Sequence, residues 1–62
     1  MPENLVAEAK KAIEAEIKLQ DHYRQMAKGV SNPKVKAVLH DLLLMEEMNE
    51  VLLRSLNQHL ES

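Results

Sequence analysis

The stretch KGVSNP, residues 28–33, divides this chain into two long segments with a helical pattern and contains its single glycine. Gly29 suits the left-handed residue that ends many helices, and Lys28 is a basic residue of the kind that the helix dipole favours in a last turn. Pro33 pushes Asn32 out of helical geometry, so Asn32 can cap a second helix that has Pro33 at its first position. The predicted elements are a first helix over about residues 3–28, a turn over 29–32 and a second helix over about 33–60.

Both segments carry an apolar stripe with alternating spacings of four and three residues, which is typical of amphipathic helices. In the first segment the stripe is flanked by Val6, Ile13, Gln20 and Ala27, and in the second the apolar residues extend over more than one face. We therefore expect the second helix to contact both its partner helix and another chain. The two stripes are Leu5, Ala9, Ala12, Glu16, Leu19, Tyr23, Met26 and Val30, and Val35, Leu39, Leu42, Glu46, Asn49, Leu53, Leu56 and Leu60.

The length of the chain limits it to one small domain with a modest core. It has no cysteine, so neither a disulfide nor a thiolate-bound metal can stabilise it. Two hairpins that pack together would cover both apolar stripes. We therefore predict an all-α fold, in which residues 1–62 form an antiparallel two-helix hairpin that dimerises into a four-helix bundle.

Composition argues against several classes of function. The net charge is −2 with interspersed signs, and Tyr23 is the single aromatic residue, so neither a basic patch nor a stacking platform for nucleic acid is expected. The first sixteen residues lack the apolar core of a signal peptide, and the longest apolar run, residues 42–45, is far too short for a membrane span. These features predict a soluble, cytoplasmic protein whose partner is a second copy of itself.

Polar residues interrupt both apolar stripes at the same height. Glu16 lies about fifteen residues before the turn and Glu46 about fifteen after it, so an antiparallel hairpin brings them to one level. Asn49 follows one turn beyond Glu46. A two-fold dimer would gather four carboxylates in one layer, and these need either cations or protons. Oxygen ligands of this kind favour hard divalent metals, with iron and manganese as the best fit.

Three segments resemble the rubrerythrin-like, ferritin-like di-iron proteins: AIEAEIKLQDHY (12–23), NPKVK (32–36) and EEMNEVLL (46–53). In that family a ligand glutamate is followed seven residues later by a tyrosine, and the second helix carries a Glu-x-x-His motif. The resemblance covers nearly the whole chain but only half of a usual four-helix domain. Encapsulated ferritins offer a precedent for building the bundle from two hairpin chains.

The resemblance implies that Glu16 and Glu46 are metal ligands, with Glu46 bridging two ions. It places Asn49 at the position of the family histidine and Tyr23 as a hydrogen-bond partner of the ligands. The implied function is a carboxylate-rich dinuclear iron site that oxidises ferrous iron with oxygen or peroxide, which would make the chain an oxidoreductase. Asn49 departs from the motif, which has histidine at this position. An amide oxygen is a weak metal ligand compared with imidazole.

The residues leave a second interpretation open. Glu16 and Glu46 can form a protonated polar layer without metal, and a buried asparagine such as Asn49 commonly sets helix register and oligomeric state. Tyr23 then becomes an ordinary core tyrosine with a hydrogen-bonded hydroxyl. In that case the chain is a structural or protein-interaction bundle that has lost the site, and the sequence alone does not decide whether it is an enzyme.

Overall fold

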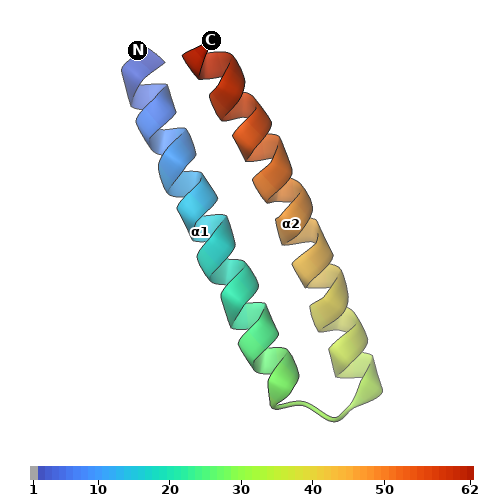
Figure 1. Cartoon of the computed structure of the whole chain (residues 1–62). Helices are drawn as coiled ribbons and strands as arrows, with labels where there is room; N and C mark the ends of the chain where they lie inside the picture. Colours follow the sequence, from blue (N-terminus) through green and yellow to red (C-terminus); the bar gives the residue numbers. More distant parts are fainter. Residues whose placement is uncertain (1) are drawn as a thin grey trace.

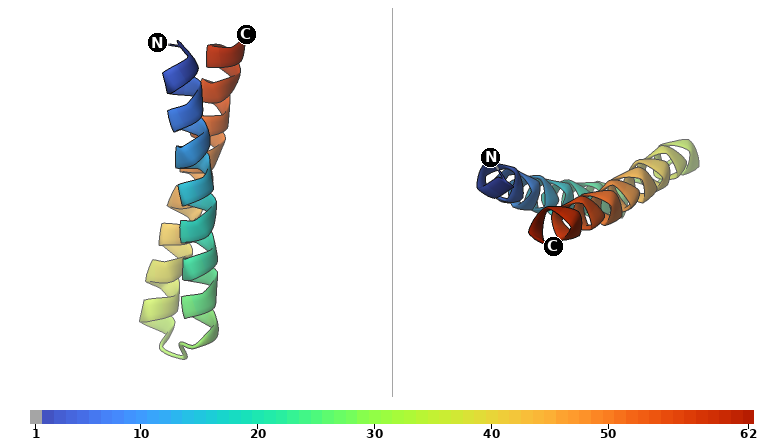
Figure 2. Two further views of the ribbon diagram at one scale, coloured as in Figure 1. Left: turned by 90° about the vertical axis from the view of Figure 1, so that its left-hand side faces the viewer. Right: turned by 90° about the horizontal axis from the view of Figure 1, so that it is seen from above.

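The chain folds into two long helices packed side by side, with its ends together (Figure 1). The computed structural model describes residues 2–62, and side chains from residue 4 onward. Helix α1 runs over Pro2–Lys28 and α2 over Pro33–Glu61, so each extends one residue beyond its predicted range. The two antiparallel helices form a rod of 46 × 14 × 12 Å, whose narrow shape is seen from two further directions in Figure 2. The predicted two-helix hairpin is confirmed.

The start of α2 follows from its capping residue. Asn32 has an extended backbone, with φ −68° and ψ 120°, and its side-chain oxygen accepts hydrogen bonds from the amides of Lys34 and Val35 at 2.8 and 3.3 Å. Pro33 follows at the first turn, where its missing N–H costs nothing. The predicted cap is therefore confirmed.

The prediction of a left-handed glycine at the end of α1 is wrong. Within the described residues no glycine has a positive φ. Instead, the amide of Gly29 donates to the carbonyl of Met26 at 3.1 Å, which tightens the last turn of the helix. This bond satisfies one of the free carbonyls at the helix end, so the turn does not need a left-handed residue.

The core between the helices is narrow. Among the described side chains, the buried apolar residues are Ala9, Ile13 and Leu39, and one polar side chain, Gln20, is equally buried. Ile13 and Gln20 were predicted to flank the stripe of the first helix, but they lie at the centre of the contact. The line of closest approach is thus rotated from the predicted one.

The rotation leaves part of the predicted stripes in solvent. On α1, Leu5 and Met26 are exposed, and on α2, Leu56 is exposed while the next residue, Asn57, turns inward. The single hairpin therefore covers only part of each stripe. The physical reason is that a single neighbouring helix covers only one edge of an apolar arc that is wider than one helix contact.

Neither helix, over residues 2–62, has the sustained apolar character that crossing a membrane requires.

Candidate functional site

The two central glutamates come together between the helices. Glu16 on α1 and Glu46 on α2 are both half-buried and interact through their side chains. A hydrogen bond with the carboxyl group of Glu46 raises the pKa of Glu16, and burial and the negative charges of Glu46 and Glu50 act in the same direction. Two carboxyl groups in a hydrogen bond hold one proton between them. The structure therefore places these residues at one level and in contact, as their spacing predicted.

Glu16 also carries an unsatisfied acceptor. Its Oε2 atom is shielded from solvent and has no hydrogen-bond partner among the described residues. A buried carboxylate oxygen without a donor is costly, because the lost hydration is not replaced. A proton, a metal ion or a donor from another chain would each remove this cost.

Asn49 lies at the edge of the glutamate pair. It is exposed, not enclosed as its stripe position predicted, and its Nδ2 donates to Glu46 Oε1 over a long 3.5 Å. On its other side Asn49 borders a shallow hollow of about 310 Å³ that is also lined by Leu44, Met45 and Met48. The amide is thus linked to the carboxylates but faces open space.

Tyr23 lies on α1 on the turn side of the glutamate pair. It is half-buried on α1, seven residues after Glu16 and therefore roughly 10 Å further along the helix. Within residues 4–62 its hydroxyl forms no hydrogen bond with Glu16 or Glu46. Its place as a hydrogen-bond partner of metal ligands stays a prediction.

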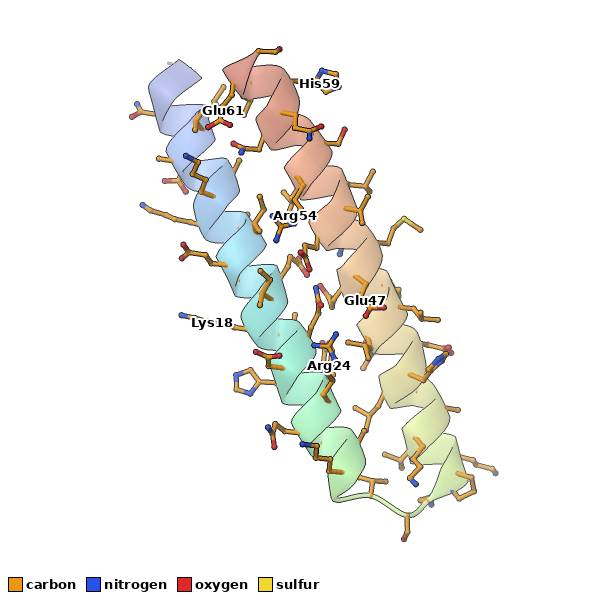
Figure 3. All side chains as sticks on the ribbon, viewed as in Figure 1. Lys18, Arg24, Glu47, Arg54, His59 and Glu61 are labelled. Atoms are coloured by element: carbon orange, nitrogen blue, oxygen red, sulfur yellow. The ribbon has the colours of Figure 1, made fainter. Side chains whose placement is uncertain are left out.

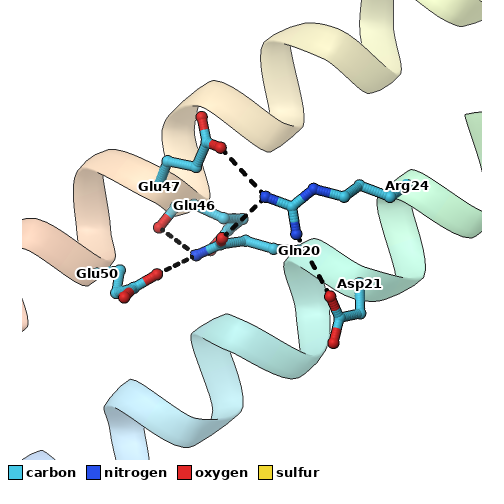
Figure 4. Close-up of polar contacts among 6 residues, drawn as sticks. All are labelled: Gln20, Asp21, Arg24, Glu46, Glu47 and Glu50. Atoms are coloured by element: carbon cyan, nitrogen blue, oxygen red, sulfur yellow. Dashed lines mark hydrogen bonds and ion pairs between the residues drawn. The ribbon is translucent and has the colours of Figure 1, made fainter.

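Gln20 and Glu50 form a polar link that the sequence interpretation missed. The Gln20 Nε2 group donates to Glu50 Oε1 at 2.8 Å and to the backbone carbonyl of Glu46 at 3.4 Å (Figure 4). Arg54 donates to Glu50 Oε2 at 2.8 Å from the same helix. The hydrogen bonds from Gln20 and Arg54 lower the pKa of Glu50, so this carboxylate stays ionised.

A signal for this link was present in the sequence. Gln20 belongs to the flanking series Val6, Ile13, Gln20 and Ala27, which repeats every seven residues like a helix seam. Reading that series as the seam would have turned Gln20 inward. Glu50 carried no such signal, because acidic residues are rarely buried without a partner.

Arg24 adds ionic contacts beside the same layer. It bonds Glu47 across the helices at 3.3 Å and Asp21 on its own helix at 3.3 Å (Figure 4). Figure 3 shows Arg24 and Glu47 pointing toward each other over the gap between the ribbons. These groups are largely exposed, so each pair contributes little to stability.

Two carboxylates of the single hairpin, one from each helix, could serve as ligands of a metal ion. Within its described residues no group of three or more histidine, cysteine, aspartate or glutamate side chains is arranged to hold a metal ion. Glu16 and Glu46 offer carboxylate oxygens, and the unsatisfied Glu16 Oε2 fits a cation. A second copy would have to provide the remaining oxygen ligands that a divalent ion takes.

Comparison of the chain with protein families, with curated proteins and with solved structures finds no match.

Proposed function

We propose that this chain is half of a ferritin-like, rubrerythrin-like metal-binding bundle. Two hairpins pack into a four-helix dimer, and Glu16 and Glu46 of both chains hold a dinuclear iron or manganese site at its centre. The observation that carries the proposal is the meeting of Glu16 and Glu46 inside the helix contact, with Glu16 Oε2 shielded and unsatisfied. The charges support it further. A dimer would bring four carboxylates into one layer, where they repel each other unless cations or protons are bound.

The ligand roles follow from position. Glu46 lies between Glu16 and Asn49, so it is the residue best placed to bridge two ions. Asn49 offers an amide oxygen once its exposed edge is covered. With iron bound, the site would support the oxidation of ferrous ions by oxygen or peroxide, as the resemblance implies. An amide oxygen in place of the histidine nitrogen would weaken metal binding relative to that family.

The test is metal content. The untagged protein is loaded anaerobically with ferrous iron, dialysed and analysed for metal per chain. We expect stoichiometric metal in the natural sequence and loss of it in Glu16→Ala. Glu14→Ala is the matched control, because Glu14 is an exposed glutamate on the same helix. Absence of stoichiometric metal in the natural protein would contradict the proposal.

A second candidate, a metal-free structural bundle, is favoured by one observation. The hydrogen bond between the Glu16 and Glu46 carboxyl groups, with the raised pKa of Glu16, is how a protonated layer satisfies itself without a cation. A thermal melt of Glu16→Leu separates the candidates. Loss of an ion-holding residue should lower the melting temperature of a metal-loaded bundle, whereas an apolar replacement should raise it in a metal-free one.

A further inference from the structure

One flank of the hairpin carries large apolar side chains that the described chain leaves uncovered. They are 43 to 62% exposed. At roughly 100° per residue, Met26 lies about 80° round α1 from Glu16, and Leu56 lies about 80° round α2 from Glu46 on the same side of the hairpin. We call this flank the apolar face, and it consists of Leu5, Met26, Val35, Val38, Met45, Leu52 and Leu56.

The opposite flank is ionic. Arg24 lies about 80° round α1 from Glu16 in the other direction, and its partner Glu47 lies about 100° round α2 from Glu46. The second ion pair between the helices, Lys10 with Glu61 at 3.3 Å, is on this side too. The hairpin therefore has one flank crossed by ion pairs and one flank, the apolar face, that is open, while exposed Leu44, Met48 and Val51 continue the apolar surface round the outside of α2.

We infer that a second copy of this chain, turned end over end, covers the apolar face. In this arrangement α1 packs against α1 and α2 against α2, and the two turns lie at opposite ends of the bundle. The two-fold axis crosses the rods at the level of Glu16 and Glu46. The inference rests on the four-helix dimer of the proposed function and specifies which helices meet and in which direction.

The spacing of the apolar residues supports this symmetry. On α1, Leu5 is eleven residues before Glu16 and Met26 is ten after it. On α2, Val35 is eleven before Glu46 and Leu56 ten after it. A copy reversed about the glutamate level therefore sets Leu5 against Met26 and Val35 against Leu56. A two-fold interface requires a surface that is complementary to itself, and the apolar face meets this requirement.

Charge supports the same orientation. Glu8 and His22 are exposed on the apolar side of α1, eight residues before Glu16 and six after it. Reversal brings Glu8 of one copy level with His22 of the other, so a carboxylate meets an imidazole ring that can donate a hydrogen bond to it. In a dimer with both turns at one end, α1 would face α2, and Glu8 would lie level with Leu52 and Leu56. A carboxylate that faces apolar groups of the other chain loses hydration, and its ion pair with Lys11 at 3.6 Å replaces that hydration only in part.

The area that is available also suits a second copy. A face of 46 by 14 Å, on the order of 600 Å² in projection, is comparable with the roughly 800 Å² that each partner buries in a stable complex. The described hairpin buries only Ala9, Ile13 and Leu39 as apolar side chains. A dimer would bring the central part of both stripes out of water, which a chain of this length needs.

The experiment measures the distance between the turns. Ser31→Cys, at an exposed position, is spin-labelled and examined by pulsed dipolar spectroscopy, with oligomeric state from sedimentation. A reversed dimer puts the labels about a rod length, 46 Å, apart. A dimer with both turns at one end gives roughly 10–20 Å, because packed helices lie about 10 Å apart. Metal content is measured on the same samples.

A matched pair of variants tests the face itself. Met45 and Val51 are each 62% exposed on α2, but only Met45 lies on the apolar face. Met45→Lys should convert the dimer to monomer at micromolar concentration, whereas Val51→Lys should leave it dimeric. Circular dichroism of the two variants checks that both remain helical.

Each outcome bears on the inference separately from the metal proposal. A long distance with a dimer supports it, with or without bound metal, and a dimer without metal counts only against the metal site. A short distance overturns it even if metal is bound. A monomer, or a monomer that binds phospholipid vesicles through the apolar face, overturns both the inference and the proposed dimer.

Discussion

The side chains of Glu16 and Glu46 meet across the contact between the two helices, and their interaction raises the pKa of Glu16. The folded chain therefore binds a proton more tightly at Glu16 than the unfolded chain does. The opposite holds at Glu50, whose hydrogen bonds from Gln20 and Arg54 stabilise the ionised form. The polar layer therefore contains two carboxylates that respond to pH in opposite directions.

The first prediction concerns pH. The pKa of Glu16 in the folded state is above its ordinary value of 4.5, so its stabilising effect is complete below 4.5 and is lost as the pH rises through the raised pKa. Glu50, with a lowered pKa, contributes stability above 4.5 that is lost only as the pH falls further. Between neutral pH and 4.5, the metal-free protein should thus gain stability from Glu16 on acidification.

Urea unfolding at fixed protein concentration, with a chelator present, measures this effect. The difference in midpoint between the natural sequence and Glu16→Gln should depend on pH, with the natural sequence gaining relative to the variant as the pH falls toward 4.5. Glu14→Gln is the control and should follow the natural sequence. A constant difference between the natural sequence and Glu16→Gln across this range would show that the two carboxyl groups do not share a proton.

The second prediction concerns Gln20. Replacing it with alanine removes a donor from Glu50 and from the Glu46 carbonyl, and it opens space in the narrow core. We expect a lower free energy of unfolding, since Glu50 and the Glu46 carbonyl both lose a hydrogen-bond donor. The double variant Gln20→Leu with Glu50→Leu should recover most of that loss, because both polar partners are removed together.

Chemical denaturation of the single and double variants decides this point. An equal loss in Gln20→Ala and in the double variant would contradict the role given to the hydrogen bond between Gln20 and Glu50.

The third prediction concerns the cap at the start of α2. Asn32→Ala removes the acceptor for the amides of Lys34 and Val35, so the free energy of unfolding should fall by about 1 kcal/mol. Asn32→Asp keeps an acceptor and should lose little. Thermal unfolding of the two variants measures the effect, and equal melting temperatures would show that the side-chain cap contributes nothing.

The fourth prediction concerns Gly29. Its φ is not positive, and an added Cβ would lie 3.8 Å from the carbonyl oxygen of Met26, which is an ordinary contact. Gly29→Ala should therefore be stabilising by roughly 0.4–1 kcal/mol, because alanine restricts the unfolded chain more than glycine does. A left-handed glycine would give the opposite sign. Denaturant unfolding distinguishes the two, so this variant tests the turn geometry directly.

Much of the local structure could be predicted from the sequence. The Asn32–Pro33 pair marked the turn and the start of α2, because proline restricts the residue before it and asparagine supplies a cap. The equal distances of Glu16 and Glu46 from the turn placed them at one level, since every helical residue adds the same rise. Gly29 was misjudged, because a helix can also end through the tighter bond from its amide to Met26.

The sequence by itself determined that this chain is a hairpin of two helices and that its central glutamates lie at one height, because both follow from local backbone rules and helix rise. Only the tertiary structure decided how each helix is rotated about its axis. An apolar arc wider than one contact allows several rotations, and contacts between the helices select among them. Here the bond from Gln20 to Glu50 accompanies a rotation that turns Glu50 inward and leaves Asn49 at the open edge.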